Sequence, residues 1–306
     1  KLRRHYKKYS SDYRTWDQRI HASEYMYFAG NLGEYLSLDE VLLSKGEIYT
    51  FLTNKEGKGK KGSLVCCCGS TLSRDIIATI KRIPQEARDK VMEVTIDMAR
   101  NMESAVKECF PNAKIVTDRF HVVKLVLDAL QHVRISYRWE AIEAENTAIA
   151  KAKEGNIKHT PKLLSNGDSP KQLLARSRYI LAKKRDQWTI NQQQRADILF
   201  KEYPILERAY NHCLQFRNMY EATDKVQAVK RLEKWQKANE TLNLKKFNIA
   251  ANSIEYNRDN ILNFFNNRST NASAESFNSK IKLFRANLRG VSDTTFFLFR
   301  LAKLFA

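Results

Sequence analysis

The chain has 306 residues, with 53 Lys and Arg against 34 Asp and Glu and a formal net charge of +19. An apolar content of 43% is ample for a packed core, which excludes a disordered chain. No apolar run approaches the roughly 20 residues that span a bilayer, and no secretion signal is visible, so we expect a cytosolic protein without a membrane segment. The strong positive charge favours a nucleic-acid partner.

The first 34 residues are basic and aromatic, and we expect them to form an arm. From residue 35 the pattern changes to short apolar runs that predict five strands, at 35–43, 48–54, 63–69, 91–96 and 113–117. Capping and stop signals predict helices at 70–84, 98–110 and 271–290. Three strands with short connections, followed by strand–helix–strand units, predict a mixed α/β sheet that is antiparallel at first and parallel later.

A long helical stretch interrupts this pattern after the fifth strand. From about residue 122 to 265 the chain shows almost only helical periodicity. We therefore divide the chain into a basic arm (1–34), the first part of the sheet domain (35–125), an all-helical insertion (126–262) and the last part of the sheet domain (263–306).

Three carboxylates occupy positions that this architecture would bring together. Asp39 lies in the middle of the first strand, Asp97 directly follows the fourth, and Glu275 begins the last helix. If the first strand is central with the fourth beside it, Asp39 and Asp97 are neighbours, and a helix packed across the sheet can add Glu275. Three oxygen ligands suit Mg²⁺ or Mn²⁺, and two such ions about 3.5–4 Å apart can activate a water or a 3′-hydroxyl for attack on a phosphodiester.

Each acid also has an ordinary interpretation. Asp39 could be a polar residue at a strand edge, although acids are depleted in strands. Asp97 could cap the helix that follows it. Glu275 lies opposite the apolar stripe of its helix, which fits a solvated face as well as a metal-binding one. That stripe consists of Phe277, Ile281, Phe284 and Leu288.

Three segments together resemble a known family. They are "SLDEV", "VTIDMARNM" with the following "KIVTDRFHVV", and "NASAESFNSKIKLFRANLRG". They are similar to the core of DDE-type bacterial insertion-sequence transposases of the ISL-three type, which carry an Asp-Arg-Phe-His signature and a Glu-Ser-x-Asn helix. The resemblance implies an RNase H-like fold, cleavage of DNA at transposon ends and transfer of the freed strand into target DNA.

The same resemblance implies a site built on two Mg²⁺ or Mn²⁺ ions. Asp39, Asp97 and Glu275 would be its catalytic and metal-binding acids. Asp118 is an alternative second acid, but it follows the fifth strand, whereas in an RNase H-like order the second acid follows the fourth. Four residues would then support the site, namely Asp118, Arg119, His121 and Asn278. His121 could also simply be a satisfied histidine that starts a helix.

Basic residues outside these acids are candidates for phosphate contacts. They are Arg3, Arg4, Lys7 and Lys8 in the arm, Arg176, Lys183 and Lys184 in the insertion, and Lys282, Arg285 and Arg289 on the last helix. The expected partner is double-stranded DNA, both the terminal inverted repeats and the target, bound by a homodimer at the bacterial nucleoid. Because only about 34 residues precede the first strand, we expect a missing segment or a separate chain to read the transposon ends.

Two other functions fit the same residues. A nuclease of this fold would cut DNA without joining the products. A non-catalytic DNA-binding protein derived from a transposase would need none of the three acids, so their joint presence argues against it.

Overall fold

The computed structural model describes residues 5–43, 46–288 and 293–306. The chain divides into two compact units, Lys1–His121 with Asp259–Ala306 (unit 1) and Val122–Arg258 (unit 2). Within the described ranges, no helix combines the length and the apolar content needed to cross a membrane.

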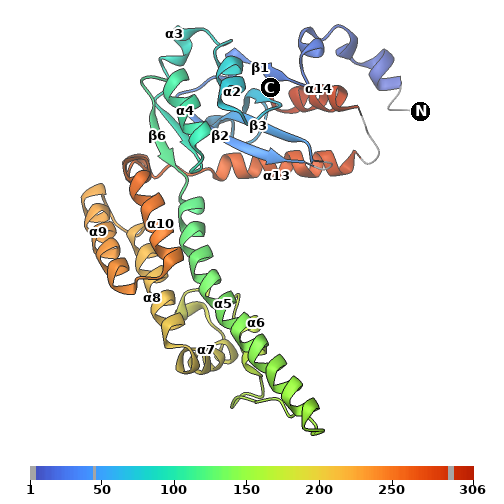
Figure 1. The fold of residues 1–306 in the computed structure, drawn as a ribbon. Coiled ribbons are helices and arrows are strands. Elements are labelled where there is room, and N and C mark those ends of the chain that lie inside the picture. Colours follow the sequence, from blue (N-terminus) through green and yellow to red (C-terminus); the bar gives the residue numbers. More distant parts are fainter. Residues whose placement is uncertain (1–4, 44–45, 289–292) are drawn as a thin grey trace. The chain divides into compact units, whose positions relative to one another are not determined.

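Unit 1 is built on a mixed six-stranded sheet with the order β1-β4-β3-β2-β5-β6 (Figure 1). The strands are β1 (Tyr25–Tyr27), β2 (Tyr35–Leu42), β3 (Ile48–Asn54), β4 (Leu64–Cys68), β5 (Glu93–Ile96) and β6 (Lys114–Thr117). Strands β2, β3 and β4 form an antiparallel meander, and β5 and β6 add in parallel beside β2. The last five strands therefore follow the order of an RNase H-like sheet, and the predicted α/β class is confirmed.

The strand count differs from the prediction, because the structure has six strands and the sequence predicts five. The additional strand, β1, pairs antiparallel with β4 at the sheet edge and buries Met26 completely. Three residues are too few to show the alternation by which a strand is recognised, and they lie in a basic, aromatic segment that looks like an arm. Part of that segment is also folded, since Tyr13 packs edge-to-face against Phe296, with ring centroids 5.1 Å apart.

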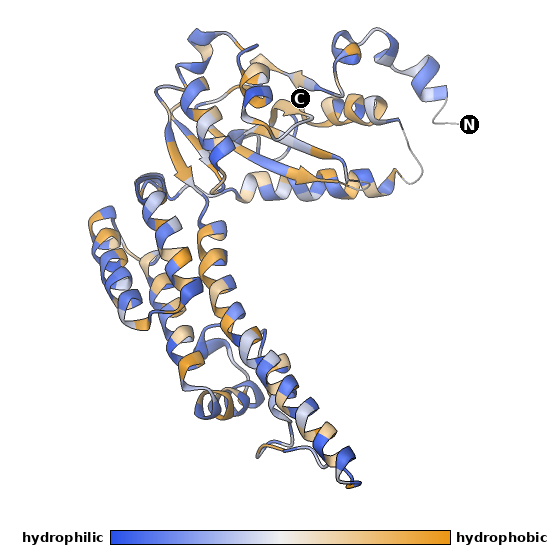
Figure 2. Cartoon of the chain, in the orientation of Figure 1, coloured by the Kyte–Doolittle hydropathy of each residue, from blue (hydrophilic) through white to orange (hydrophobic). Residues whose placement is uncertain are grey.

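Helices cover both faces of the sheet. One face packs against α2 (Ser73–Ile80), α3 (Gln85–Arg88) and α4 (Arg100–Cys109), with Leu36, Leu38 and Val94 in its core. The other face packs against α13 (Ala272–Asn287) and α14 (Thr294–Phe305). In Figure 2, α14 is coloured as mostly hydrophobic. The predicted apolar stripe of α13 is confirmed, because Phe277 and Ile281 are fully buried and Phe284 and Leu288 pack beside them.

Unit 2 is entirely helical in its described secondary structure, apart from turns and loops. Its helices are α5 (Arg119–Glu154), which begins in unit 1, α6 (Pro170–Arg176), α7 (Ile190–Glu202), α8 (Pro204–Met219), α9 (Lys225–Leu242) and α10 (Lys245–Tyr256). Two further short helices, α11 (Arg258–Leu262) and α12 (Phe264–Asn267), lead the chain back to α13.

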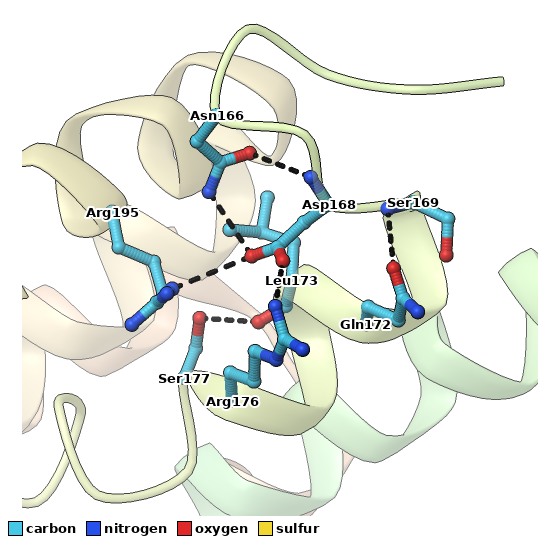
Figure 3. A network of polar contacts seen from close by, with 8 residues as sticks. All are labelled: Asn166, Asp168, Ser169, Gln172, Leu173, Arg176, Ser177 and Arg195. Carbon is cyan, nitrogen blue, oxygen red and sulfur yellow. Dashed lines mark hydrogen bonds and ion pairs between the residues drawn. The ribbon is translucent and has the colours of Figure 1, made fainter.

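A buried carboxylate organises the loop before α6. Asp168 is 2% exposed, and its carboxylate is paired with Arg176 and with Arg195, whose Nε lies 3.4 Å away (Figure 3). The Asn166 side-chain amide donates a third hydrogen bond, of 3.0 Å. Because a buried charge needs such partners, Arg176 serves the fold of unit 2. Its predicted role as a phosphate contact therefore competes with an internal ion pair.

Candidate active site

Strand register brings three acids into one row at the end of the parallel strands. Ser37 of β2 pairs with Thr95 of β5, and Thr95 pairs with Val116 of β6. Two residues further along each strand, the chain reaches Asp39, Asp97 and Asp118. Adjacent strands lie about 4.8 Å apart, so Asp97 is the neighbour of both other acids, and Asp39 and Asp118 are separated by about twice that spacing.

The row faces α13. Asp39 pairs across the strands with Phe51, and the Phe51 ring packs edge-to-face on Phe277 of α13, with centroids 5.5 Å apart. Directly paired residues in a sheet point to the same face. Asp118 continues the ladder, because its N–H donates to the Ile96 carbonyl at 2.8 Å. The acids therefore lie on the sheet face that α13 crosses.

Asp39 is a half-buried acid with an elevated pKa. Burial, with a smaller contribution from the nearby Asp97 charge, raises the pKa of this carboxyl from its usual value to about 6. The Glu40 N–H, His121 and the Asn278 amide oppose the shift of this pKa. The Asn278 Nδ2 donates to Asp39 Oδ2 at 2.7 Å. The structure thus brings four predicted residues together, Asp39, Asp97, His121 and Asn278.

Helix α13 crosses the row from β6 to β2. At its start the Asn271 N–H donates to Asp118 Oδ1 at 3.4 Å, and seven residues later Asn278 reaches Asp39. Seven helical residues advance about 10 Å, which matches two strand spacings of about 10 Å. Glu275, exposed in the first turn of the helix, lies between these two contacts and on the same helix face as both. Its backbone therefore lies over β5, the strand that Asp97 directly follows.

Several buried polar atoms at this end of the sheet lack a hydrogen-bond partner within the part of the chain that the structure describes. They are Ser37 Oγ, Asp118 Oδ2, Asn278 Oδ1 and both side-chain polar atoms of Asn271. Asp118 is 2% exposed, and its Oδ2 lies 4.0 Å from His121 Nε2, beyond hydrogen-bond distance. Buried acceptors without donors are costly, so this end of the sheet is suited to a cation.

The chemistry of the donors fits a hard divalent cation. Carboxylate and amide oxygens are the ligands that Mg²⁺ and Mn²⁺ prefer. The pKa of Asp39 is raised mainly by burial and to a lesser extent by the Asp97 charge, and a bound cation would favour the ionised form of both acids. Among the described residues, no three His, Cys, Asp or Glu side chains stand close enough together to hold a metal as they are. Asp39 and Asp97 are adjacent, and the exposed Glu275 side chain would complete the set by turning toward them.

Sequence reasoning missed a half-buried lysine beside the row. Lys55 Nζ lies 3.2 Å from Glu93 Oε1 and also contacts the Thr95 hydroxyl, while Asn267 Nδ2 donates to Glu93 Oε2 at 3.2 Å. Burial lowers the pKa of Lys55, and the charges of Glu93 and Asp118 oppose that shift. Lys55 begins the Lys-rich turn "KEGKGKKG", in which no local signal separates it from its neighbours.

The predicted phosphate contacts fall into three groups. Lys7, which is paired with Asp293, and Lys8 line a hollow of about 590 Å³. Arg14 and Arg19, two arginines that the sequence does not single out, line the same hollow. Lys282 is exposed on α13. Lys183 is half-buried in unit 2, and Lys184 is paired with Glu221. Three further candidates, Arg3, Arg4 and Arg289, lie outside the described residues.

Arg285 has a different environment from the one expected. It is 5% exposed, its Nε donates to Glu47 Oε2 at 2.8 Å, and its guanidinium lies over the Phe297 ring, 5.0 Å from the centroid. An arginine held in this way joins α13 to the β2–β3 connection. We therefore assign Arg285 to the fold instead of to phosphate binding.

The raised pKa of Asp39 predicts a pH-dependent gain in stability for Asp39→Asn. Ionised Asp39 disfavours the folded state, so its cost is absent below about pH 4 and fully present above about pH 6. At pH 7.5 the variant should be more stable by up to about 3 kcal/mol, since each pKa unit corresponds to about 1.4 kcal/mol. Melting temperatures measured without divalent ions between pH 4 and 8 check this expectation.

The exposed Glu240 of α9 provides the matched control, because Glu240→Gln removes a charge that has no buried partner. Its melting temperature should follow the parent at every pH. An Asp39→Asn variant that is no more stable than the parent at pH 7.5 would contradict the buried, charged state of Asp39.

Comparisons with known proteins identify a family for the chain. The family model DDE_Tnp_ISL3, described as a transposase, matches residues 36–301. The transposase for insertion sequence element IS1001 of Bordetella parapertussis is 23% identical over 275 residues, which cover 89% of this chain and 61% of that relative. The chain thus spans about three fifths of the length of this curated relative. No solved structure matches the chain.

Proposed function

Because the chain belongs to the ISL3-type DDE transposase family, we propose that it cleaves DNA at the ends of a transposable element and joins the freed 3′-hydroxyl to target DNA. Its expected place of action is the bacterial cytoplasm, at the nucleoid. The observation that carries the proposal is the row of acids, in which Asp39 and Asp97 are neighbours below the helix that bears Glu275.

Three residues are proposed to hold the metal ions. Asp39 and Asp97 would supply carboxylate oxygens from adjacent strands, and Glu275 would supply a third carboxylate from α13. Bound Mg²⁺ or Mn²⁺ supplies the polarisation by which a water or a 3′-hydroxyl attacks a phosphodiester and the leaving oxygen is stabilised. The carboxylates would hold the ions at one end of the sheet. Burial there raises the pKa of Asp39, so a bound cation would favour its ionised form.

Asp118, His121 and Asn278 are proposed as positioning residues. The Asn278 amide holds one Asp39 oxygen, and the Glu40 N–H holds the other at 2.9 Å, so the orientation of this carboxylate is fixed. Asp118 accepts the N–H of Asn271 and thereby fixes the start of α13, four residues before Glu275. His121 lies beside both aspartates and can face a phosphate. The preference for Asp97 over Asp118 rests on its place next to Asp39.

Phosphate contacts are proposed for Lys7, Lys8, Arg14 and Arg19 around their common hollow, and for Lys282 on α13. Lysine and arginine at such positions bind the DNA backbone without reading its sequence. Arg119, exposed after β6 and 6.0 Å from the Phe264 ring centroid, is a further candidate to contact DNA.

Anomalous diffraction from crystals soaked in Mn²⁺ tests the site directly. We expect density between Asp39 and Asp97, with Glu275 turned toward it. Density at Asp118 without Asp97 would mean that Asp118 is the second metal-binding acid, and the protein would still be a metal-dependent enzyme. An absence of bound Mn²⁺, also with DNA present, would support the non-catalytic alternative. An assay that scores both cutting and joining then separates a transposase from a nuclease of the same fold.

A further inference from the structure

Helix α5 carries a stripe of four apolar residues and one asparagine on the side that points away from the rest of unit 2. Spacings of four and three residues alternate along the stripe, which comprises Ile135, Trp139, Ile142, Asn146 and Ile149. At 100° per residue these positions fall within about one quarter of the helix circumference. Alternating spacings of this kind define the a and d positions of a heptad, here with Trp139 and Asn146 at a and the three isoleucines at d.

Most of the stripe is open to solvent in unit 2. Ile135 is 41% exposed, Trp139 65% and Ile149 44%, Asn146 is also exposed, and Ile142 is half-buried. The opposite side of the same helix faces the unit, where Tyr137, Ala141 and Ala148 line a cavity of about 480 Å³ together with Tyr203. Single exposed apolar residues are ordinary, but a continuous row with a large aromatic ring indicates an interaction surface.

We propose that this stripe binds the same stripe of a second copy of the chain, as a parallel, in-register helix pair. A two-fold axis along the stripe makes the surface complementary to itself, as a symmetric dimer requires. Each isoleucine and Trp139 would then pack against its own counterpart. The helix is already formed, because Arg134 Nη1 donates to the Leu174 carbonyl at 2.8 Å and Gln131 Nε2 to the Arg178 carbonyl at 3.1 Å. Pairing therefore needs no folding step.

Two polar features select the parallel orientation. In register, Asn146 meets Asn146 of the second copy, and the two amides can hydrogen-bond within the apolar seam. An antiparallel pair would instead bury Asn146 against Ile135, which leaves an amide without a partner. Arg138 and Glu143 flank the seam at g and e positions, so each Arg138 would face Glu143 of the other copy in the parallel pair. Charge and amide pairing thus agree.

The dimer is independent of the proposed catalytic activity, because it needs neither DNA nor metal. Sedimentation velocity of the full chain at tens of micromolar is expected to give a dimer. Trp139→Glu should give a monomer at the same concentration, with an unchanged circular dichroism spectrum, since the side chain is already exposed. The control is Val226→Glu on α9, where Val226 is 66% exposed, and it should remain dimeric.

Disulfide trapping tests the register. The five native cysteines are all buried, so a cysteine introduced on α5 is the reactive one. Asn146→Cys should cross-link two chains under mild oxidation, whereas Thr147→Cys, exposed on the neighbouring position of α5, should cross-link at least tenfold more slowly. A monomeric parent protein, a dimer that survives Trp139→Glu, or equal cross-linking at 146 and 147 would each overturn the proposal.

Discussion

Asp39→Asn, Asp97→Asn and Glu275→Gln are each expected to lower metal-dependent DNA cleavage by about 10³-fold or more while DNA binding is retained. Each change preserves the shape of the side chain and removes one charge from the proposed metal-binding set. Groups that stabilise developing charge in a transition state contribute rate effects of this order. Cleavage of end-labelled DNA in Mn²⁺, with binding followed by fluorescence anisotropy, measures both properties.

Asp118→Asn is the matched control for this series. Asp118 keeps its hydrogen bond to the Asn271 N–H as an amide, and its proposed role is to position α13. A loss of about tenfold is expected for this variant, well below that of the triad variants. Normal cleavage after any one triad change would remove that residue from the site, and a larger loss at Asp118 than at Asp97 would exchange their roles.

Phe277→Ala is expected to destabilise unit 1 by about 3–5 kcal/mol, as large-to-small changes of buried phenylalanines do. The ring is fully buried on α13 and packs edge-to-face on Phe51 and on Phe305, with centroids 5.5 and 5.0 Å away. Because Glu275 lies two residues before Phe277, loosening this anchor should also lower cleavage. Urea unfolding followed by circular dichroism gives the free-energy change, and the cleavage assay gives the functional one.

Leu283→Ala separates packing from helix propensity. Leu283 is on the same helix and is 63% exposed, so its truncation should change the free energy of unfolding by less than about 0.5 kcal/mol. Equal destabilisation by the two changes would mean that α13 is not anchored to the sheet through Phe277.

The sequence predicts the sheet well where local patterns suffice. Strands β2 and β3 and the direction changes between them follow from apolar runs separated by turn residues, and the crossover helices follow from capping and proline signals. The edge strand β1 escaped prediction because three residues carry no periodicity, and it is formed by pairing with β4. Tertiary pairing, not local preference, decides such short strands.

The candidate site is predictable in its members but not in its register. Asp39 can be named as an acid inside a strand, and Asp97 and Asp118 as acids that follow strands, yet their alignment in one row depends on pairings such as Ser37 with Thr95. The roles of charged residues are harder still to predict. Lys55 and Arg285 look like other basic residues in the sequence, and only the fold pairs them with Glu93 and Glu47, respectively. Composition predicts the amount of positive charge, and only the structure distributes it between internal pairs and open surface.

The position of α13 in the chain has a consequence for biosynthesis. All six described strands have been synthesised by Thr117, but the helices that cover one face of the sheet follow only after the whole of unit 2. At about 5–20 residues per second, that face stays uncovered for roughly 10–30 s during translation. During this interval Phe51 and Val41 are not covered by α13 and α14, and Glu275 has not yet been synthesised. A chain that ends before α13 therefore leaves this face of the sheet uncovered and lacks the proposed third acid, so covering of the core and addition of Glu275 occur in one step.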